Sequence, residues 1–461
     1  MQSCPKIPKF DSNSTFSSST SGISTTKMFK AVILIGGPQK GTRFRPLSFD
    51  VPKPLFPVAG VPTIQHLIES CCDIPRLREI LLIGYYHQHD DVINQFISSM
   101  MNEYSINIRY LQEYTALGTA GGIYHFRDQI QSGDPEGFFL INGDVCGEFP
   151  LVDMVKFHEK KKKDCWITVL ATEATRQQSQ QYGCIVEDKN THQIVHYVEK
   201  PSTFVSQIIN CGVYLCSLDI FDHLSAVFKQ RQHEFYNGLY SFSWNNEQST
   251  DITNSLKDCI SLEQDVLMPL ANKGKVYAFH STRWWSQIKT AGSAIYANRH
   301  YLDLYNKIHR LWLAQNSLHG PTIIGNVFIH PTAVVHETAH LGPNVSIGKN
   351  VVIGAGVRIK ESIVLGNATI HDHSLVLHSI IGWNSTVGSW ARIEGTPCDP
   401  NPNKPFAKME NVPLFNNNGH LNPSITVLGS DVHVLAEVIV LNTIVLPHKD
   451  LSQSYKNEII L

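Results

Sequence analysis

One stretch near the N-terminal end combines a flexible backbone with side chains that bind phosphate. A short apolar run, Ala31–Ile35, predicts a buried strand that ends at Gly36 and Gly37. Glycine N–H groups can face phosphate oxygens with no Cβ in the way. Hydroxyl and cationic donors follow at Thr42, Arg43 and Lys53. A lone Gly-Gly pair would favour a solvated basic loop, but these residues in this order predict a phosphate-binding turn.

The same stretch carries a family signature. Residues 36–47 read GGPQKGTRFRPL and residues 52–55 read PKPL, which resembles the signature of the sugar-1-phosphate nucleotidyltransferases. Residues 28–461 are similar to the GDP-mannose pyrophosphorylase branch of this family, most closely to its regulatory, alpha-type members. The resemblance implies a Rossmann-like domain with a mostly parallel sheet, then a left-handed parallel β-helix of hexapeptide repeats. Active relatives have one residue between Gly-Gly and Gly-Thr-Arg, whereas this chain has Pro38, Gln39 and Lys40.

The totals of the chain exclude several classes of protein. At 461 residues it is too long for one ordinary core, so we expect two domains. A net charge of −2 gives no footprint for nucleic acid or an anionic membrane, and no apolar run could span a bilayer. The ten cysteines show no metal-binding spacing, which favours buried thiols and a reducing, cytoplasmic location. Residues 1–27, rich in Ser and Thr without a signal-peptide core, predict a disordered leader.

Residues 28–310 predict an α/β domain of the nucleotidyltransferase type. Expected strands are Ala31–Ile35, Glu79–Ile83, Ile106–Leu111 and Phe138–Asn142, and expected helices are Thr63–Cys72, Asp90–Met101 and Gly121–Gln131. This alternation predicts a mostly parallel sheet with helices on both faces and ligands at the carboxyl ends of its strands. Gly36-Gly37, Leu117-Gly118-Thr119 and Asn142-Gly143-Asp144 all fall at such ends. The polar stretch His233–Ser261 predicts an irregular surface insertion.

Residues 320–461 follow a six-residue period. Aliphatic residues expected to point inward are Ile329, Val335, Leu341, Ile347, Ile353, Ile359 and Leu365, then, after a phase shift, Leu375, Ile381, Val387 and Ile393, and finally Leu428, Val434, Val440 and Leu446. A sustained six-residue period predicts a parallel β-helix. Residues 394–427 interrupt it with prolines and asparagines, so we expect an inserted loop that is functional or disordered. The flat face of a stacked coil suits self-association or association with a partner.

The resemblance also implies a metal-dependent reaction. A pyrophosphorylase joins a sugar-1-phosphate to a nucleoside triphosphate by positioning phosphates and neutralising their charge with a divalent metal. Relatives hold Mg²⁺ with two aspartates, of which Asp144 is the first; a turn or helix cap is the plain alternative for it. The second would lie in a W-x-D-I-G-like element, but residues 285–289 read WSQIK. Gln287 is a weaker ligand and the Lys289 ammonium would repel Mg²⁺, so any Mg²⁺ site should be weak, and Arg43 and Lys53 vestigial as catalytic residues.

The residues that would bind a nucleotide sugar are present. The resemblance implies that Glu113 accepts from guanine, although an exposed loop glutamate explains it nearly as well from sequence alone. It also assigns Gly118 and Thr119 to base and ribose, Glu199 to sugar hydroxyls and Lys200 to phosphate. The expected binding set is Gly36, Gly37, Thr42, Arg43, Lys53, Glu113, Gly118, Thr119, Asn142, Asp144, Gly183, Glu199, Lys200 and Asn210.

Three functions remain open at this point. The first is a regulatory, non-catalytic subunit that binds GDP-mannose, joins a homologous catalytic beta subunit in a hetero-oligomer and mediates feedback inhibition in GDP-mannose biosynthesis. The second is an active GTP:mannose-1-phosphate guanylyltransferase that tolerates Gln287. The third, a hexapeptide acyltransferase, is disfavoured by the N-terminal signature. The lengthened turn, where Pro38 removes an N–H donor, and Gln287 together favour the first.

Overall fold

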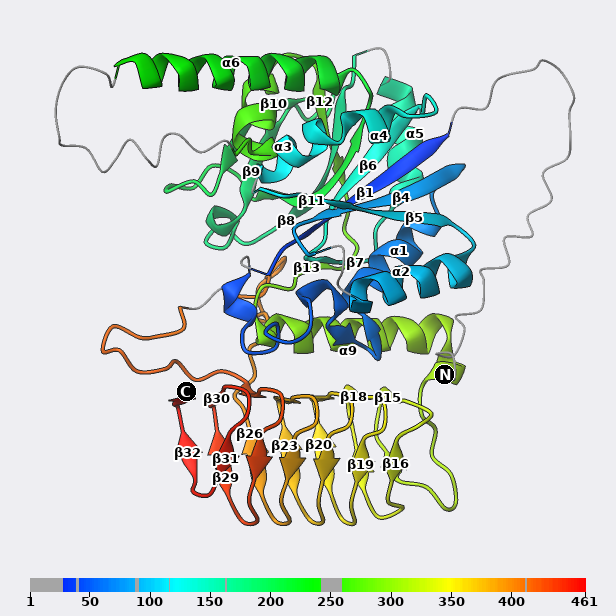
Figure 1. The fold of residues 1–461 in the computed structure, drawn as a ribbon, viewed down its shortest axis with the longest axis vertical. Coiled ribbons are helices and arrows are strands. Elements are labelled where there is room, and N and C mark those ends of the chain that lie inside the picture. Colours follow the sequence, from blue (N-terminus) through cyan, green and yellow to red (C-terminus); the bar gives the residue numbers. More distant parts are fainter. Residues whose placement is uncertain are drawn as a thin grey trace, which may run out of the picture.

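The computed structural model describes residues 28–38, 41–87, 91–115, 117–161, 164–241, 259–410 and 413–461. The expected leader, residues 1–27, and Gln39 and Lys40 of the lengthened turn lie outside the described residues. The chain forms an α/β part and a coil of short parallel strands, which lies below it in Figure 1. None of the described helices is long and apolar enough to cross a membrane.

A nine-stranded mixed sheet forms the centre of the α/β part. Its order is β10-β9-β11-β6-β1-β4-β5, with β8 pairing both β11 and β12. The strands are β1 (Phe29–Gly36), β4 (Leu77–Gly84), β5 (Asn107–Gln112), β6 (Gly137–Asn142), β8 (Ile167–Glu173), β9 (Gly183–Glu187), β10 (Ile194–Glu199), β11 (Ile208–Cys216) and β12 (Val276–His280). Strands β6, β1, β4 and β5 run parallel, whereas β11 is antiparallel to β6, β8 and β9. The carboxyl ends of the four parallel strands therefore share one edge.

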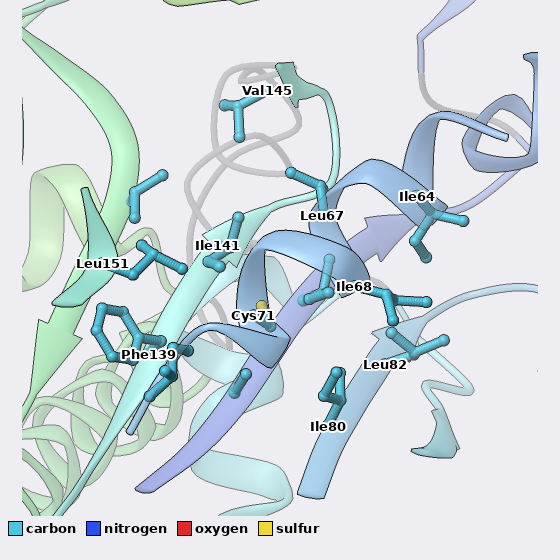
Figure 2. Packing of buried hydrophobic residues seen from close by; sticks show 14 of the residues in the cluster. Ile64, Leu67, Ile68, Cys71, Ile80, Leu82, Phe139, Ile141, Val145 and Leu151 are labelled. Atoms are coloured by element: carbon cyan, nitrogen blue, oxygen red, sulfur yellow. The ribbon is translucent and has the colours of Figure 1, made fainter. Parts of the chain in front are cut away.

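Helices cover both faces of this sheet (Figure 1). They are α1 (Thr63–Cys72), α2 (Asp91–Tyr104), α3 (Gly118–His125), α4 (Arg127–Gln131), α5 (Leu151–Lys161), α6 (Ile220–Ser241) and the short α8 (Met268–Leu270). Figure 2 shows one face, where α1 places Ile64, Leu67, Ile68 and Cys71 against buried residues of β4 and β6. Burying each Leu or Ile contributes roughly 1.5–3 kcal/mol. This packing holds the strand ends in place.

Two element predictions in this part are wrong. Gly121–Gln131 forms two helices, α3 and α4, because the chain turns at Phe126 and so brings both Phe126 and Ile130 into the core. The prediction of irregular structure from His233 fails because α6 continues to Ser241. Apolar residues at the start of α6 anchor it to the core, and the Lys, Gln, Arg and Glu residues that follow are good helix formers. Residues 242–258 of that stretch lie outside the described residues.

The second part is a parallel coil, the architecture expected of a left-handed β-helix, with sheets of seven, seven and six strands. The first sheet holds β14 (Thr322–Ile323), β17 (His340–Leu341), β20 (Arg358–Lys360), β23 (Leu375–Leu377), β26 (Arg392–Glu394), β29 (Ile439–Leu441) and β32 (Tyr455–Lys456). The second holds β15 (Val327–Ile329), β18 (Val345–Ile347), β21 (Ile363–Val364), β24 (Ser379–Ile381), β27 (Thr426–Leu428), β30 (Ile444–Val445) and β33 (Ile459–Ile460). The third holds β16 (Val334–Val335), β19 (Val352–Ile353), β22 (Thr369–Ile370), β25 (Thr386–Val387), β28 (His433–Val434) and β31 (Asp450–Leu451).

The hexapeptide pattern predicts most of the coil interior, with three errors of one residue. Three hexapeptides make one turn of 18 residues, and Leu341 pairs with Ile359 at this spacing. Ile359 pairs with Val376, so the next turn is one residue shorter. Because the corner after Ile359 is shorter by one residue, Val364 points inward and Leu365 packs on the outside against the α/β part. Val376 likewise replaces Leu375, and Val445 replaces Leu446, in the coil interior.

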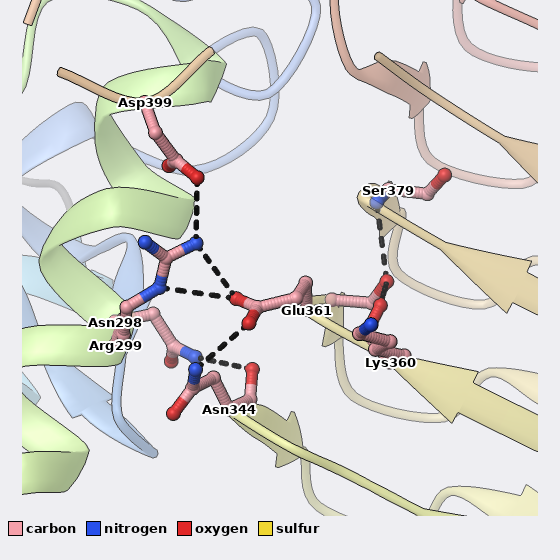
Figure 3. A network of polar contacts seen from close by, with 8 residues as sticks. Asn298, Arg299, Asn344, Lys360, Glu361, Ser379 and Asp399 are labelled. Atoms are coloured by element: carbon pink, nitrogen blue, oxygen red, sulfur yellow. Dashed lines mark hydrogen bonds and ion pairs between the residues drawn. The ribbon is translucent and has the colours of Figure 1, made fainter. Parts of the chain in front are cut away.

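Helix α9 (Ala291–Ile308) joins the two parts (Figure 1). Its apolar residues, among them Ile295 and Leu302, share one buried cluster with Ile363, Leu365 and Val427 of the coil. Figure 3 shows the polar contact beside it. The Arg299 guanidinium donates to Glu361 Oε2 at 3.0 Å and to Asp399 Oδ2 at 3.0 Å. Arg299 therefore ties α9 both to the coil and to the segment between β26 and β27.

Candidate functional site

A first cavity, of about 280 Å³, opens at the shared edge of the parallel strands. Gly36 ends β1 and Asn142 ends β6, and both line it. From the expected binding set, the cavity brings together Gly36, Gly37, Lys53, Glu113, Gly118, Thr119, Asn142 and Asp144. A Cβ built on Gly36, whose φ is +69°, would meet no atom within 4 Å. The edge beside this glycine is therefore open to a ligand.

A second cavity, of about 360 Å³, adjoins the first, and Asn142 and Asp144 line both. It contains Gly183, Glu199, Lys200 and Asn210 of the expected set, together with Gln287 and Lys289. The first cavity has a larger share of apolar wall (Ile35, Ile83 and Ile288 among others), and the second is lined by amide, carboxylate and hydroxyl groups. This division suits a base on one side and a sugar phosphate on the other.

A buried hydrogen-bond network forms the floor of the second cavity. Asn210 Nδ2 donates to the Tyr197 hydroxyl at 3.1 Å and to the Tyr214 hydroxyl at 2.8 Å. The Tyr197 hydroxyl donates to Glu199 Oε2 at 3.0 Å. Burial raises the pKa of both tyrosines well above the ordinary value, so their hydroxyls stay neutral. The network fixes Asn210 and Glu199 in orientation, which is what a site that distinguishes sugar hydroxyls requires.

Ser261, Glu263 and Gln264 also line the second cavity and are missed by the sequence prediction. They belong to the start of a short helical turn, η4 (Leu262–Leu267), whose cap Ser261 accepts from the N–H of Gln264. Glu263 accepts from the hydroxyls of Ser261, Thr119 and Tyr214. The sequence feature that could have revealed this turn is the S-x-x-Q spacing of Ser261 and Gln264, which is typical of a helix start.

At two positions of the expected binding set, the packing of the protein itself requires glycine, in addition to any approach of a ligand. At Gly118, φ +81°, a Cβ would lie 2.5 Å from the carbonyl oxygen of Ile260. At Gly183 it would lie 2.0 Å from the Tyr197 hydroxyl. The absence of a side chain at these positions therefore lets η4 and the Tyr197 network approach the cavities.

Thr42 and Arg43 line neither cavity and are exposed, in the turn η1 (Thr42–Phe44). The charge of Arg43 nevertheless acts on the neighbouring lysines. Burial lowers the pKa of Lys53 and of Lys289; the negative charge of Asp144 opposes each shift, and the Arg43 charge adds to it. Asp144 therefore shares the first cavity with Lys53 and the second with Lys289, and its negative charge acts on both ammonium groups.

Two paired strands bring Asp144, Gln287 and Lys289 together. Strands β7 (Val145–Gly147) and β13 (Trp285–Gln287) pair antiparallel, with Gln287 opposite Val145. The N–H of Ile288 donates to the carbonyl oxygen of Asp144 at 2.7 Å. Gln287 Oε1 is buried and has no hydrogen-bond partner among the described residues. The two positions that would carry the paired aspartates thus lie side by side, one as a carboxylate and one as an amide.

The segment between β26 and β27 contacts the back of the second cavity. The Gln178 side chain accepts from the N–H of Lys408 at 2.8 Å and donates to its carbonyl oxygen at 2.7 Å. Lys408 Nζ lies 5.8 Å from the ring centroid of Trp285. Trp285 in turn packs edge-on against Tyr182, which lines the second cavity. One continuous set of contacts therefore runs from that cavity to the segment.

Comparison with known proteins agrees with this architecture. Residues 30–303 match the family described as nucleotidyl transferase, and residues 323–460 match the GMPPB C-terminal domain. The chain is 58% identical over 434 residues to the mannose-1-phosphate guanylyltransferase regulatory subunit alpha-A of Danio rerio. It is 58% identical to the regulatory subunit alpha of Drosophila melanogaster and 56% identical to that of Rattus norvegicus. Each alignment covers 94% of this chain and 100% of the relative. The chain therefore belongs to the nucleotidyltransferases, and within them to the family of mannose-1-phosphate guanylyltransferase regulatory alpha subunits.

Proposed function

We propose that this chain is a non-catalytic regulatory subunit that binds GDP-mannose at the strand ends of the α/β part and transmits its level to a homologous catalytic beta subunit. The observation that carries the proposal is the pair of adjoining cavities around Asp144. One offers the turn at Gly36 and the Glu113 carboxylate for a guanine nucleotide. The other offers Glu199, Lys200 and Asn210 for a sugar phosphate. A bound nucleotide sugar would span both.

The donor set next to Asp144 is a poor fit for Mg²⁺, which nucleotidyltransferases generally use. Mg²⁺ binds proteins through hard, preferably anionic oxygens. Here the second position is the neutral Gln287, and Asp144 acts electrostatically on the neighbouring ammonium groups of Lys53 and Lys289, which would repel a cation. Glu199 and Glu263, the other carboxylates of the second cavity, already accept hydrogen bonds from hydroxyl groups. The site therefore favours binding of a nucleotide sugar over its synthesis.

The segment 394–427 is our candidate for the regulatory contact with the catalytic subunit, and the coil is our candidate for the association itself. Beyond the Lys408 attachment the segment forms a small turn. In it, Phe415 and Leu421 form an antiparallel backbone pair, and the N–H of His420 donates to Asn416 Oδ1. Leu414 and Phe415 are about half exposed there, at 48% and 49%. Exposed apolar side chains on a supported loop are typical of a surface that binds a protein. Self-association would use the flat faces of the coil.

Ligand-induced stabilisation tests the binding half of this proposal. At a hundredfold excess over its dissociation constant, GDP-mannose should stabilise the fold by roughly 2.7 kcal/mol. Lys200→Ala should reduce the shift, because Lys200 lines the second cavity and provides a cation for a phosphate. The measurement is a thermal-unfolding series, and Lys189→Ala, an exposed lysine in the turn between β9 and β10, is the matched control.

The possible results separate the alternatives. Stabilisation that weakens in Lys200→Ala but not in Lys189→Ala supports the assigned cavity. Equal stabilisation in both variants removes Lys200 from the site. No stabilisation of the unmodified chain by GDP-mannose would contradict the proposed function.

A further inference from the structure

Lys289 is held in a fixed position at the wall of the second cavity. Its backbone N–H donates to Ser293 Oγ at 3.0 Å, one turn into α9. The next residue, Thr290, caps α9 through a reciprocal pair of hydrogen bonds with Ser293. On its other side Lys289 continues directly from β13, which is paired with β7 beside Asp144. The backbone is thus held on both sides of Lys289, which fixes where its side chain enters the cavity.

The environment of the Lys289 side chain is that of a built-in cation. It lines the second cavity with Asp144, Gln287 and Lys200, and its Nζ lies 5.4 Å from the ring centroid of Tyr182. An ordinary surface lysine would extend into water instead of lining a cavity with a carboxylate.

The balance of charge explains what this lysine can do. In the pattern implied for active relatives, two aspartates are neutralised by one divalent cation. Here Asp144 and Lys289, which both line the second cavity, carry opposite charges, and Gln287 beside them is uncharged. The two charges cancel without any metal. A diphosphate that approaches meets the cations Lys53 and Lys200, while the other carboxylates of the second cavity, Glu199 and Glu263, accept hydrogen bonds from hydroxyl groups.

We propose that the Lys289 ammonium takes the place of the metal ion, so that this chain binds a nucleoside diphosphate sugar without a divalent cation. This inference rests on the proposed function and specifies which group balances the phosphate charge of the bound ligand. The unpaired Gln287 Oε1 is the second part of this replacement of metal by protein groups. As a buried acceptor it needs a donor, and a sugar hydroxyl can supply one where a cation would otherwise sit.

The test is calorimetric titration of the full chain with GDP-mannose, once in EDTA and once in excess MgCl₂. The unmodified chain should bind equally well in both. Lys289→Met should bind about tenfold more weakly in EDTA, since a charge-assisted contact to phosphate is lost. Lys289→Arg should keep most of the affinity in EDTA. The double variant Gln287→Asp with Lys289→Gly, which recreates a carboxylate pair, should bind only in MgCl₂.

Lys189→Met is the control for the loss of an exposed lysine, and circular dichroism establishes that each variant is folded. If the unmodified chain loses its binding in EDTA, or if folded Lys289→Met binds as tightly as the unmodified chain in EDTA, the inference is wrong while the proposed function stands. If the unmodified chain binds GDP-mannose in neither buffer, the proposed function itself fails. Metal dependence that appears only in the double variant would establish the exchange of lysine for metal.

Discussion

At the scale of single residues, we propose that Glu113 decides which base the first cavity accepts. It lines that cavity, and its backbone N–H donates to the carbonyl oxygen of Gly84 at 2.7 Å, at the end of β4. A Cβ on Gly122 would lie 2.3 Å from Glu113 Oε1, so the carboxylate lies close against the middle of α3. A carboxylate at a fixed position can accept from both N1–H and N2–H₂ of guanine, a donor pair that adenine lacks.

Glu113→Gln should therefore reduce the preference for GDP over ADP. The amide keeps one acceptor oxygen but turns an NH₂ group toward a guanine donor, which costs about tenfold in GDP affinity and little for ADP. Competitive titration of the two nucleotides measures the ratio. An unchanged ratio would mean that another group reads the base.

Sequence-based predictions of which residues line the cavities agree with the structure where a residue sits at a strand end. Gly36, Asn142 and Asp144 line the cavities because the sequence period already places their strands in parallel. They fail where a distant segment supplies the group. Ser261 and Glu263 reach the second cavity through a turn that packs on Gly118, a contact that no local pattern encodes.

At the scale of elements, α9 is the piece that couples the α/β part to the coil. Arg299 is the polar centre of this contact, with a side chain 28% exposed, and it faces Glu361, 9% exposed (Figure 3). Asn344 Nδ2 donates to the other oxygen of Glu361 at 2.8 Å. The periodicity of the coil predicted its strands, but the packing of α9 on the second sheet of the coil depends on tertiary contacts and could not be read from the period.

Arg299→Ala should destabilise the fold by about 3 kcal/mol, because the Glu361 carboxylate would stay buried with only Asn344 as a partner. Urea unfolding followed by circular dichroism measures the change. Lys307→Ala is the matched control on the same helix, since Lys307 forms an exposed pair with Asp303, and it should have no measurable effect. Equal stability of the two variants would show that the Arg299 contact is not part of the joint.

At the scale of the whole molecule, the segment between β26 and β27 connects the ligand site to the outer surface. The prediction from sequence placed this insertion and its boundaries near the observed strand ends, Glu394 and Thr426. It could not show that Lys408 is held by Gln178 and stacks near Trp285, because those contacts join residues more than a hundred positions apart. A ligand that moves Tyr182 and Trp285 would thereby alter the segment, which is the differential contact that regulation requires.

Deleting Pro397–Asn422 while keeping the coil should leave subunit association intact and abolish inhibition of the complex by GDP-mannose. A milder variant, Leu414→Ser with Phe415→Ser, keeps the Lys408 attachment and should weaken inhibition without removing ligand binding. Rate assays of the complex at increasing GDP-mannose measure both. If product inhibition is unchanged in an assembled complex carrying the deletion, the segment is not the transmitter.

The central claim is that this chain binds the product of a pyrophosphorylase without making it. The most direct measurement is pyrophosphate release by the purified chain, free of any homologue, from GTP and mannose-1-phosphate with Mg²⁺. We predict no release above that of GTP alone, because Gln287 and Lys289 stand where a carboxylate would hold the metal. Robust Mg²⁺-dependent formation of pyrophosphate and GDP-mannose would contradict the account and identify the chain as an active guanylyltransferase.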